Sequence, residues 1–252
     1  MTGPAPPTAC ALIIGNEILS GKTQDANLQY LGVELAKLGI KLAEARVVRD
    51  EPDAIVRHLN ECRAQFTYVF TTGGIGPTHD DITAECVARA FGVELVVDPA
   101  AVALLKRGSR PLNEARLKMA RVPKGAALIE NALSGAPGFR IGNVLVLAGI
   151  PSIARAMFEA AAPTLTRGRQ IHSAGVDVYL REGDFAEALE RIALAHPEVD
   201  IGSYPFQREG GFGATLVVRG TDAALIERTL AEVAAAMTAL GGEVKPARLS
   251  GT

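Results

Sequence analysis

The chain has 252 residues, of which 48% are hydrophobic and 21% charged, a composition typical of a globular protein with one large or two moderate domains. Gly, Pro or charged residues interrupt its apolar runs well before the roughly 18 residues that a membrane-spanning helix needs, so no membrane partner is expected. The 26 Lys and Arg residues nearly balance the 28 Asp and Glu residues without a long basic run, so no nucleic-acid partner is expected, although a local basic patch stays compatible with this charge.

The first residues predict a disordered tail followed by a buried strand. Residues 1–8 are rich in Pro and lack both basic residues and an apolar core, so they do not read as a signal peptide. Residues 9–15 are apolar and end at Gly15, which predicts a short buried strand. The three Cys residues are far apart and show no metal-type spacing, so we expect reduced thiols in a cytoplasmic protein.

Helices and strands then alternate along the chain. Four leucines at spacings of three and four mark one face of a helix that would end at Gly39; they are Leu28, Leu31, Leu35 and Leu38. Further strands are expected at residues 41–48, 67–72, 93–97 and 143–149, and helices at 50–66, 81–92 and 150–163. This alternation predicts the α/β class, as a three-layer α/β/α sandwich with a mostly parallel sheet.

The sequence changes character at residues 163–170, a polar segment led by Pro that is typical of a linker. We therefore expect a first domain at residues 9–165 and a smaller one at 170–248. The smaller domain has predicted strands at 175–180, 199–206 and 212–220 and amphipathic helices at 184–196 and 222–240. This β-α-β-β-α order predicts a small α+β domain of the split βαβ type.

Ligand-binding loops are expected where parallel strands end, because ligands of open α/β sheets bind beyond the carboxyl ends of the strands. Three polar loops follow predicted strands. They contain Glu17 with Ser20, Arg49 with Asp50, and the glycine-rich turn TTGGIGPTHDDIT at residues 71–83.

The glycine-rich turn combines two features that conflict for a bare phosphate. Gly73, Gly74 and Gly76 let an anion approach the backbone, and the helix that follows adds oriented amides, whereas Asp80 and Asp81 would repel the anion. The conflict is resolved if a divalent cation bridges carboxylate and phosphate, or if the carboxylates bind hydroxyl and amine groups of the ligand. A simpler alternative is that one of the two aspartates only caps the helix.

Several separated segments carry a resemblance to a known family. IIGNEILSGKTQDAN, VVRDEP, TTGGIGPTHDDIT, SGAPGF and AGIPS follow one another within residues 9–165. In this order they resemble the molybdopterin-binding domain of the MoaB/MogA group. The resemblance is closest to the N-terminal domain of competence-damage-inducible protein A (CinA) and to the pterin-binding-like domain of some FAD synthases. Residues 170–245 resemble the smaller domain that follows in CinA-type proteins.

The resemblance implies a site for a phosphate-bearing pterin, with molybdopterin as one such ligand, or for a nucleotide. It points to Asp50, Asp80 and Asp81 as catalytic carboxylates that hold Mg²⁺ or another divalent cation. The implied ligand contacts are Glu17, Ser20, Thr72, Gly73, Gly74, Gly76, Ser134, Gly135 and Gly138. Asn16 stands where the family often has Asp, which removes one charge from the cation site.

Lys118 is a further candidate for contact with a ligand phosphate, because it lies in the basic run RLKMAR together with Arg116 and Arg121. The alternative is that this run forms a solvated face of a helix.

Three functions are compatible with such a site. The first is a metal-dependent hydrolase that cleaves the pyrophosphate of a nucleotide such as ADP-ribose or FAD. The second is molybdopterin binding with adenylyl transfer in molybdenum cofactor biosynthesis. The third is a non-catalytic regulator that binds a ligand, and we expect a homo-oligomer formed through the small domain. The paired Asp80 and Asp81 and the CinA-like second domain favour the hydrolase.

Overall fold

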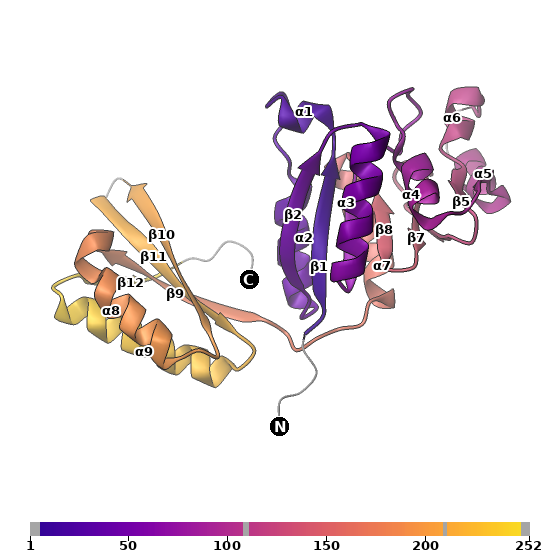
Figure 1. The fold of residues 1–252 in the computed structure, drawn as a ribbon. Coiled ribbons are helices and arrows are strands. Elements are labelled where there is room, and N and C mark those ends of the chain that lie inside the picture. Colours follow the sequence, from indigo (N-terminus) through magenta and orange to yellow (C-terminus); the bar gives the residue numbers. More distant parts are fainter. Residues whose placement is uncertain (1–5, 108–110, 209–210, 248–252) are drawn as a thin grey trace. The chain divides into compact units, whose positions relative to one another are not determined.

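A computed structural model describes residues 6–107, 111–208 and 211–247 (Figure 1). The chain divides into two compact units, Met1–Leu35 with Gly39–Gly168, and Ala36–Leu38 with Arg169–Thr252. Of the predicted tail, residues 1–5 lie outside the described residues, and Thr8 already belongs to the first strand. None of the helices in the described ranges combines the length and the apolar character that crossing a membrane requires.

The first unit is built on a six-stranded sheet with the order β2-β1-β3-β8-β7-β6. Its four parallel strands are β1 (Thr8–Ile14), β2 (Lys41–Val48), β3 (Tyr68–Thr72) and β8 (Val144–Leu147). Two antiparallel strands extend the sheet beyond β8, namely β7 (Gly138–Ile141) and β6 (Ala127–Ile129). The predicted, mostly parallel sheet is confirmed.

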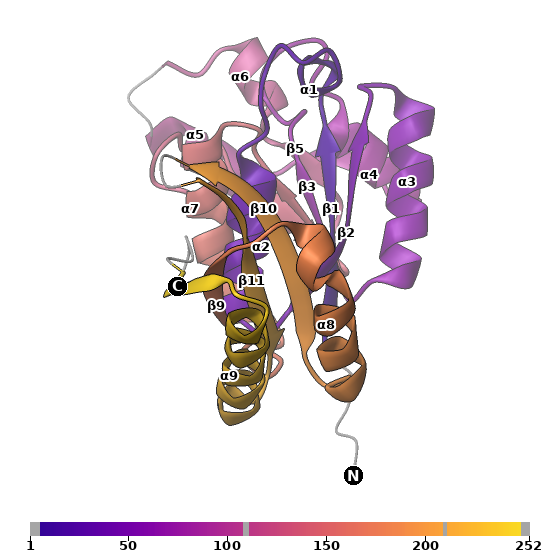
Figure 2. The same cartoon turned by 90° about the vertical axis from the view of Figure 1, so that its left-hand side faces the viewer.

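Helices cover both faces of this sheet. The helices α2 (Asn27–Lys37) and α7 (Pro151–Ala161) lie on one face, and α3 (Pro52–Gln65) and α4 (Thr83–Phe91) on the other (Figure 2). Alternate residues of β1, among them Cys10 and Leu12, pack in one buried cluster with residues of α3 and α4. On the opposite face, Phe70 of β3 contacts Phe158 of α7, with ring centroids 5.7 Å apart. The predicted three-layer α/β/α sandwich is therefore confirmed, and the strands β1, β3 and β8 are buried on both faces.

The segment between α4 and β6 differs from the prediction. It contains α5 (Pro99–Arg107), α6 (Glu114–Lys118), β4 (Leu95–Val97) and β5 (Arg121–Pro123). The predicted strand at 93–97 does not join the main sheet, because β4 pairs with β5 in a separate antiparallel sheet. Arg121 consequently lies in a strand and not on the helix that carries Lys118. The predicted polar loop after β1 also contains a short helix, α1 (Asn16–Leu19), and the short 3-10 helix η1 (Ala162–Thr164) follows α7.

The second unit has the element order β-α-β-β-α-β. Its elements are β9 (His172–Tyr179), α8 (Glu182–Ala195), β10 (Asp200–Arg208), β11 (Gly211–Gly220), α9 (Ala223–Ala239) and β12 (Glu243–Pro246). The strands form an antiparallel sheet in the order β10-β11-β9-β12. This is the predicted split βαβ arrangement with one additional strand, β12.

The start of α9 offers a test of the second unit. Asp222 is the N-cap residue, and its side chain accepts hydrogen bonds from the amides of Ala224 at 2.9 Å and Leu225 at 3.1 Å. Asp222→Ala should lower the free energy of unfolding of this unit by about 1 kcal/mol, whereas Asp222→Asn keeps an acceptor and should change it little. Hydrogen exchange of the α9 amides measures the effect. Equal protection in Asp222→Ala and in the unchanged protein would contradict it.

Candidate functional site

The strand order of the first unit reverses between β1 and β3. The chain passes from β1 to β2 on one side and from β3 to β8 on the other, so β1 and β3 are neighbours whose connections diverge. The Gly15 amide donates to the Val48 carbonyl, and the Gly73 amide to the Leu147 carbonyl, each at 3.2 Å, so both loops start in register with the sheet. Such a reversal is where open α/β sheets bind their ligands.

Backbone segments of the loops approach one another closely at this point. Gly73 has φ 100°, and a Cβ atom added to it would overlap the carbonyl oxygen of Ile14 at the end of β1. A Cβ atom on Gly149, after β8, would lie 3.3 Å from the Gly73 Cα. The Thr83 hydroxyl donates to the Gly73 carbonyl at 2.9 Å, and the Thr83 amide donates to the Gly74 carbonyl at 2.9 Å. Only glycine suits position 73, both for its backbone angle and for the space available.

The Asp81 carboxylate is fixed across this turn. Its Oδ2 atom accepts hydrogen bonds from the Thr78 amide at 2.8 Å and from the Thr78 hydroxyl. A Cβ atom on Gly76 would lie 2.6 Å from the same oxygen, so the carboxylate rests against the backbone of Gly76. The Lys118 ammonium donates to the Thr78 carbonyl. Lys118 thus fixes Thr78, and Thr78 in turn fixes Asp81.

Neither Asp80 nor Asp81 is the cap of the following helix. The helix α4 begins at Thr83, and its N-cap residue is Ile82, which makes no side-chain capping bond. The alternative in which one aspartate only caps this helix is therefore wrong. Hydrogen bonding from Thr78 and from its own backbone amide holds the pKa of Asp80 below its ordinary value, and the charges of His79 and Lys118 act in the same direction. Asp80 is therefore an ionised neighbour of Asp81 at neutral pH.

A cavity of about 1440 Å³ opens against these loops. Its wall contains many of the residues predicted for the site, namely Glu17, Gly73, Gly74, Gly76, Asp81, Ser134 and Gly135. Apolar side chains such as Leu104 and Ile153 line other parts of the wall, and Arg107 and Arg116 add positive charge. Lys118 borders a much smaller hollow of about 30 Å³ together with Gly74, Gly76 and Asp81.

Other predicted residues do not line this cavity. Asp50 accepts a hydrogen bond from the Asn16 amide at 2.8 Å and so joins the loop after β2 to the loop after β1. The Ser20 hydroxyl donates to the Glu17 carbonyl at 3.2 Å. Thr72 is buried in β3, and within the described ranges its hydroxyl has no hydrogen-bond partner. Gly138 packs against the Val146 carbonyl within the sheet.

The carboxylates predicted to hold a cation are spread over two loops, with Asp50 after β2 and Asp80 and Asp81 after β3. In the part of the chain that the structure describes, no group of three or more His, Cys, Asp or Glu side chains could hold a metal ion. Asp50, Asp80 and Asp81 therefore do not form a ready-made cluster of three carboxylate ligands. The Asp50 carboxylate instead has a structural partner in the Asn16 amide.

Two asparagines outside the predicted site residues shape the site. Asn131 Oδ1 accepts from the Ser134 amide at 2.9 Å and from its hydroxyl at 3.1 Å, and Asn131 Nδ2 donates to the Ala136 carbonyl at 2.5 Å. Asn27 donates to the Gly149 carbonyl at 2.9 Å across 122 residues of sequence. An Asn close before Ser-Gly is a turn signal that identifies Asn131. A local pattern gives no such signal for Asn27.

Two segments of the sequence match known families. Residues 10–167 match the probable molybdopterin binding domain, and residues 170–241 match the middle domain of FAD synthase. The chain belongs to the molybdopterin-binding domain family. The resemblance inferred from the sequence motifs is thereby confirmed.

Individual relatives show which members of the family the chain resembles. A protein of Archaeoglobus fulgidus is 33% identical over 192 residues, which cover 76% of this chain and 83% of the relative. A CinA-like protein of Gloeobacter violaceus is 32% identical over 256 residues, which cover 94% of this chain and 58% of the relative. The crystal structure of CinA from Thermoplasma acidophilum is 33% identical with a TM-score of 0.59, and the match covers 63% of this chain and 98% of that one. The chain is thus CinA-like.

The packing of Gly73 predicts a difference between two glycine substitutions. Gly73 and Gly125 both have positive φ, but a Cβ atom on Gly125 meets nothing within 4 Å. Gly125→Ala should therefore lower the free energy of unfolding only by the backbone strain, about 1–2 kcal/mol. Gly73→Ala adds the overlap with the Ile14 carbonyl to this strain, so it should lower the free energy of unfolding by at least twice as much. Urea denaturation measures both values, and equal losses would show that the loop after β3 has room to move away from β1.

Proposed function

We propose that the chain binds a phosphate-bearing pterin or nucleotide in the cavity beside Asp81 and hydrolyses a pyrophosphate bond with the help of a divalent cation. The placement of Asp81 carries this proposal. Its carboxylate borders the cavity next to the Gly73–Gly76 turn, is held by Thr78, and does not cap a helix. A carboxylate fixed in this way beside a glycine turn on the cavity wall suits a cation that accompanies a phosphate group.

The size and the lining of the cavity support a ligand larger than a single phosphate or sugar. Small-molecule pockets usually measure about 300–1,000 Å³, and this one measures about 1440 Å³. The apolar wall around Leu104 and Ile153 suits a flat heterocycle, and Arg107 and Arg116 lie on the same wall. A pyrophosphate that joins two ring-bearing groups, as in ADP-ribose or FAD, combines these requirements.

The residues beside the turn fit a cation that is bound jointly with the ligand. Mg²⁺ prefers six oxygen ligands and is usually held by one or two carboxylates plus phosphate oxygens of the substrate. Asp81, with Asp80 beside it, supplies the protein's share, so a cluster of three carboxylates is not required. When bound, such a cation polarises the phosphoryl group and lowers the pKa of a bound water. The chain's own part is to orient the ligand and keep Asp81 in place.

A second candidate function is molybdopterin binding with adenylyl transfer. The matched family description, a probable molybdopterin binding domain, supports the binding part of this candidate. The same glycine turn and the same carboxylates would receive the terminal phosphate of the pterin. A non-catalytic regulator that assembles as a homo-oligomer would use the same cavity for binding alone.

The hydrolase is tested by product analysis. The purified chain is incubated with ADP-ribose, FAD or NAD in the presence of Mg²⁺, Mn²⁺ or Co²⁺, and AMP is measured by chromatography. We expect AMP release that depends on the cation. Asp81→Asn should lower it on the order of 100-fold or more, the loss typical of a removed catalytic group. Asn keeps an acceptor for the Thr78 amide, so the fold should persist.

Glu94→Gln is the matched control, because it also removes one carboxylate charge. Glu94 pairs with Lys124 at 3.1 Å on the surface, its side chain is 74% exposed, and it does not line the cavity. Its AMP release should equal that of the unchanged protein. Unaltered activity in Asp81→Asn would refute the site. A lack of AMP from every substrate would refute the hydrolase and turn attention to direct binding of molybdopterin.

A further inference from the structure

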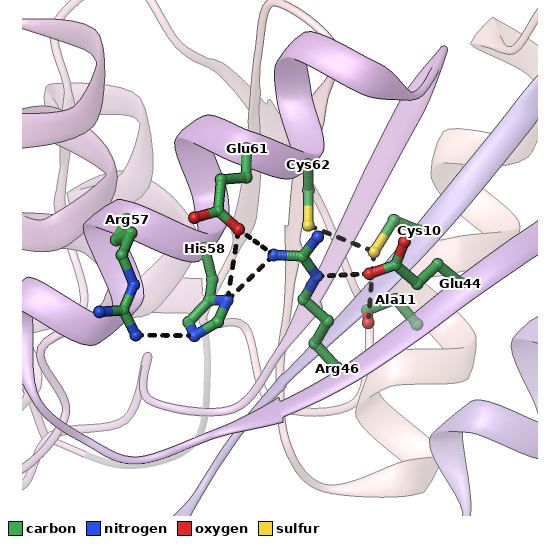
Figure 3. A network of polar contacts seen from close by, with 8 residues as sticks. All are labelled: Cys10, Ala11, Glu44, Arg46, Arg57, His58, Glu61 and Cys62. Atoms are coloured by element: carbon green, nitrogen blue, oxygen red, sulfur yellow. Dashed lines mark hydrogen bonds and ion pairs between the residues drawn. The ribbon is translucent and has the colours of Figure 1, made fainter.

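Cys10 and Cys62 form a buried pair of thiols (Figure 3). Cys10 lies on β1 and Cys62 on α3, both are fully buried, and the Cys10 thiol donates a hydrogen bond to the Cys62 sulfur at 3.4 Å. A disulfide has an S–S length of about 2.05 Å. The two sulfur atoms therefore need to approach each other by a small side-chain movement to form a covalent bond.

Arg46 lies beside the thiol pair on the neighbouring strand β2. Its guanidinium contacts Glu44 at 2.5 Å, His58 at 3.0 Å and Glu61, and Figure 3 shows it next to the Cys62 sulfur. The Arg46 side chain is 20% exposed, whereas both thiols are fully buried, so a peroxide reaches the thiols only when the side chains around Arg46 move aside. These contacts hold a positive charge beside Cys62.

This environment distinguishes the two thiols from each other and from the third. The hydrogen bond from Cys10 lowers the pKa of Cys62; burial opposes this effect, and the charge of Arg46 adds to it. The same hydrogen bond, together with burial, raises the pKa of Cys10. Burial raises the pKa of Cys86 to about 11. Cys62 is therefore the thiol that ionises first, with Cys10 within reach as its partner.

We propose that Cys10 and Cys62 are a redox-sensitive site that a small peroxide converts into an intramolecular disulfide. The Cys62 thiolate attacks a peroxide oxygen, the O–O bond breaks, and the departing hydroxide takes up the former Cys62 proton to become water. Cys62 is then a sulfenic acid. The Cys10 sulfur attacks the Cys62 sulfur, the S–O bond breaks, and the leaving oxygen takes the Cys10 proton to form a second water. Two thiols lose two electrons, and hydrogen peroxide gains them.

The bond would tie together two elements that lead to the candidate site. The strand β1 ends immediately before Gly15, and α3 begins shortly after Asp50. The two loops at these ends are already joined by the hydrogen bond from the Asn16 amide to Asp50. A covalent link between β1 and α3 restricts the unfolded chain, so the oxidised protein should melt at a higher temperature than the reduced protein.

Peptide mapping tests the proposal directly. Trypsin releases the three cysteines in separate peptides, residues 1–22, 58–63 and 64–89. The full chain is treated with hydrogen peroxide, alkylated in denaturant and digested without reductant. We expect residues 1–22 linked to 58–63, with the mass of the two peptides less two hydrogen atoms, while Cys86 in 64–89 carries the alkyl group.

Variants separate this site from general thiol oxidation. Cys86→Ala should leave the rate of link formation unchanged. Arg46→Gln should slow it about tenfold if the lost charge is worth one pKa unit, and Arg46→Lys should restore most of it. Alkylation of both Cys10 and Cys62 after peroxide treatment of the unchanged protein would overturn the proposal. So would links between two chains in place of links within one, or oxidation of Cys86 at the same rate.

Discussion

The contact between Gly73 and the Ile14 carbonyl is the constraint on which the candidate site depends. It brings the end of β1 against the start of the loop after β3 with no side chain between them. Gly149 then packs against Gly73 from the end of β8, and Asn27 holds the Gly149 carbonyl. Gly73, Gly74, Gly76 and Gly149 all line the cavity beside this contact. Three strand ends thus form one surface, which separate flexible loops would not achieve.

The polar groups above this surface are placed by a short relay of hydrogen bonds. Lys118 binds the Thr78 carbonyl, and Thr78 binds Asp81 through both its amide and its hydroxyl. Lys118 comes from α6, in the segment that forms its own small sheet outside the main one. That segment therefore contributes to the site indirectly, by fixing a carboxylate at the cavity wall. A site held by packed elements keeps its geometry better than one on free loops.

Local sequence signals account for most of the fold and fail where pairing is decided at long range. Apolar runs and β-branched residues located β1, β3 and β8, and Gly39, at φ 69°, ends α2 as expected. The pairing of β4 with β5 was not predictable, because a strand of three residues carries no signal for its partner. The strand β12 was not predicted, because Glu243–Pro246 contains a single hydrophobic residue, Val244, besides its Pro. Such a segment suits only the edge of a sheet, where β12 lies. Among the site residues, the motif predicted Gly73, Gly74, Gly76 and Asp81, which line the cavity. In the described residues, Asp50 bonds the Asn16 amide and does not join Asp80 and Asp81 in a group of three possible metal ligands.

The charges at the turn imply that ligand and cation depend on each other in the proposed reaction. Asp81 and its ionised neighbour Asp80 repel a phosphate that arrives alone, and the Asp81 carboxylate by itself offers a lone cation few ligands. Together, the phosphate oxygens complete the cation's ligand set, and the cation cancels the repulsion. Each partner then raises the affinity for the other by the same factor, since such coupling is reciprocal. Asn16, just after the end of β1, carries no charge, which fits this balance, because fewer carboxylates at the site leave more of the coordination to the ligand.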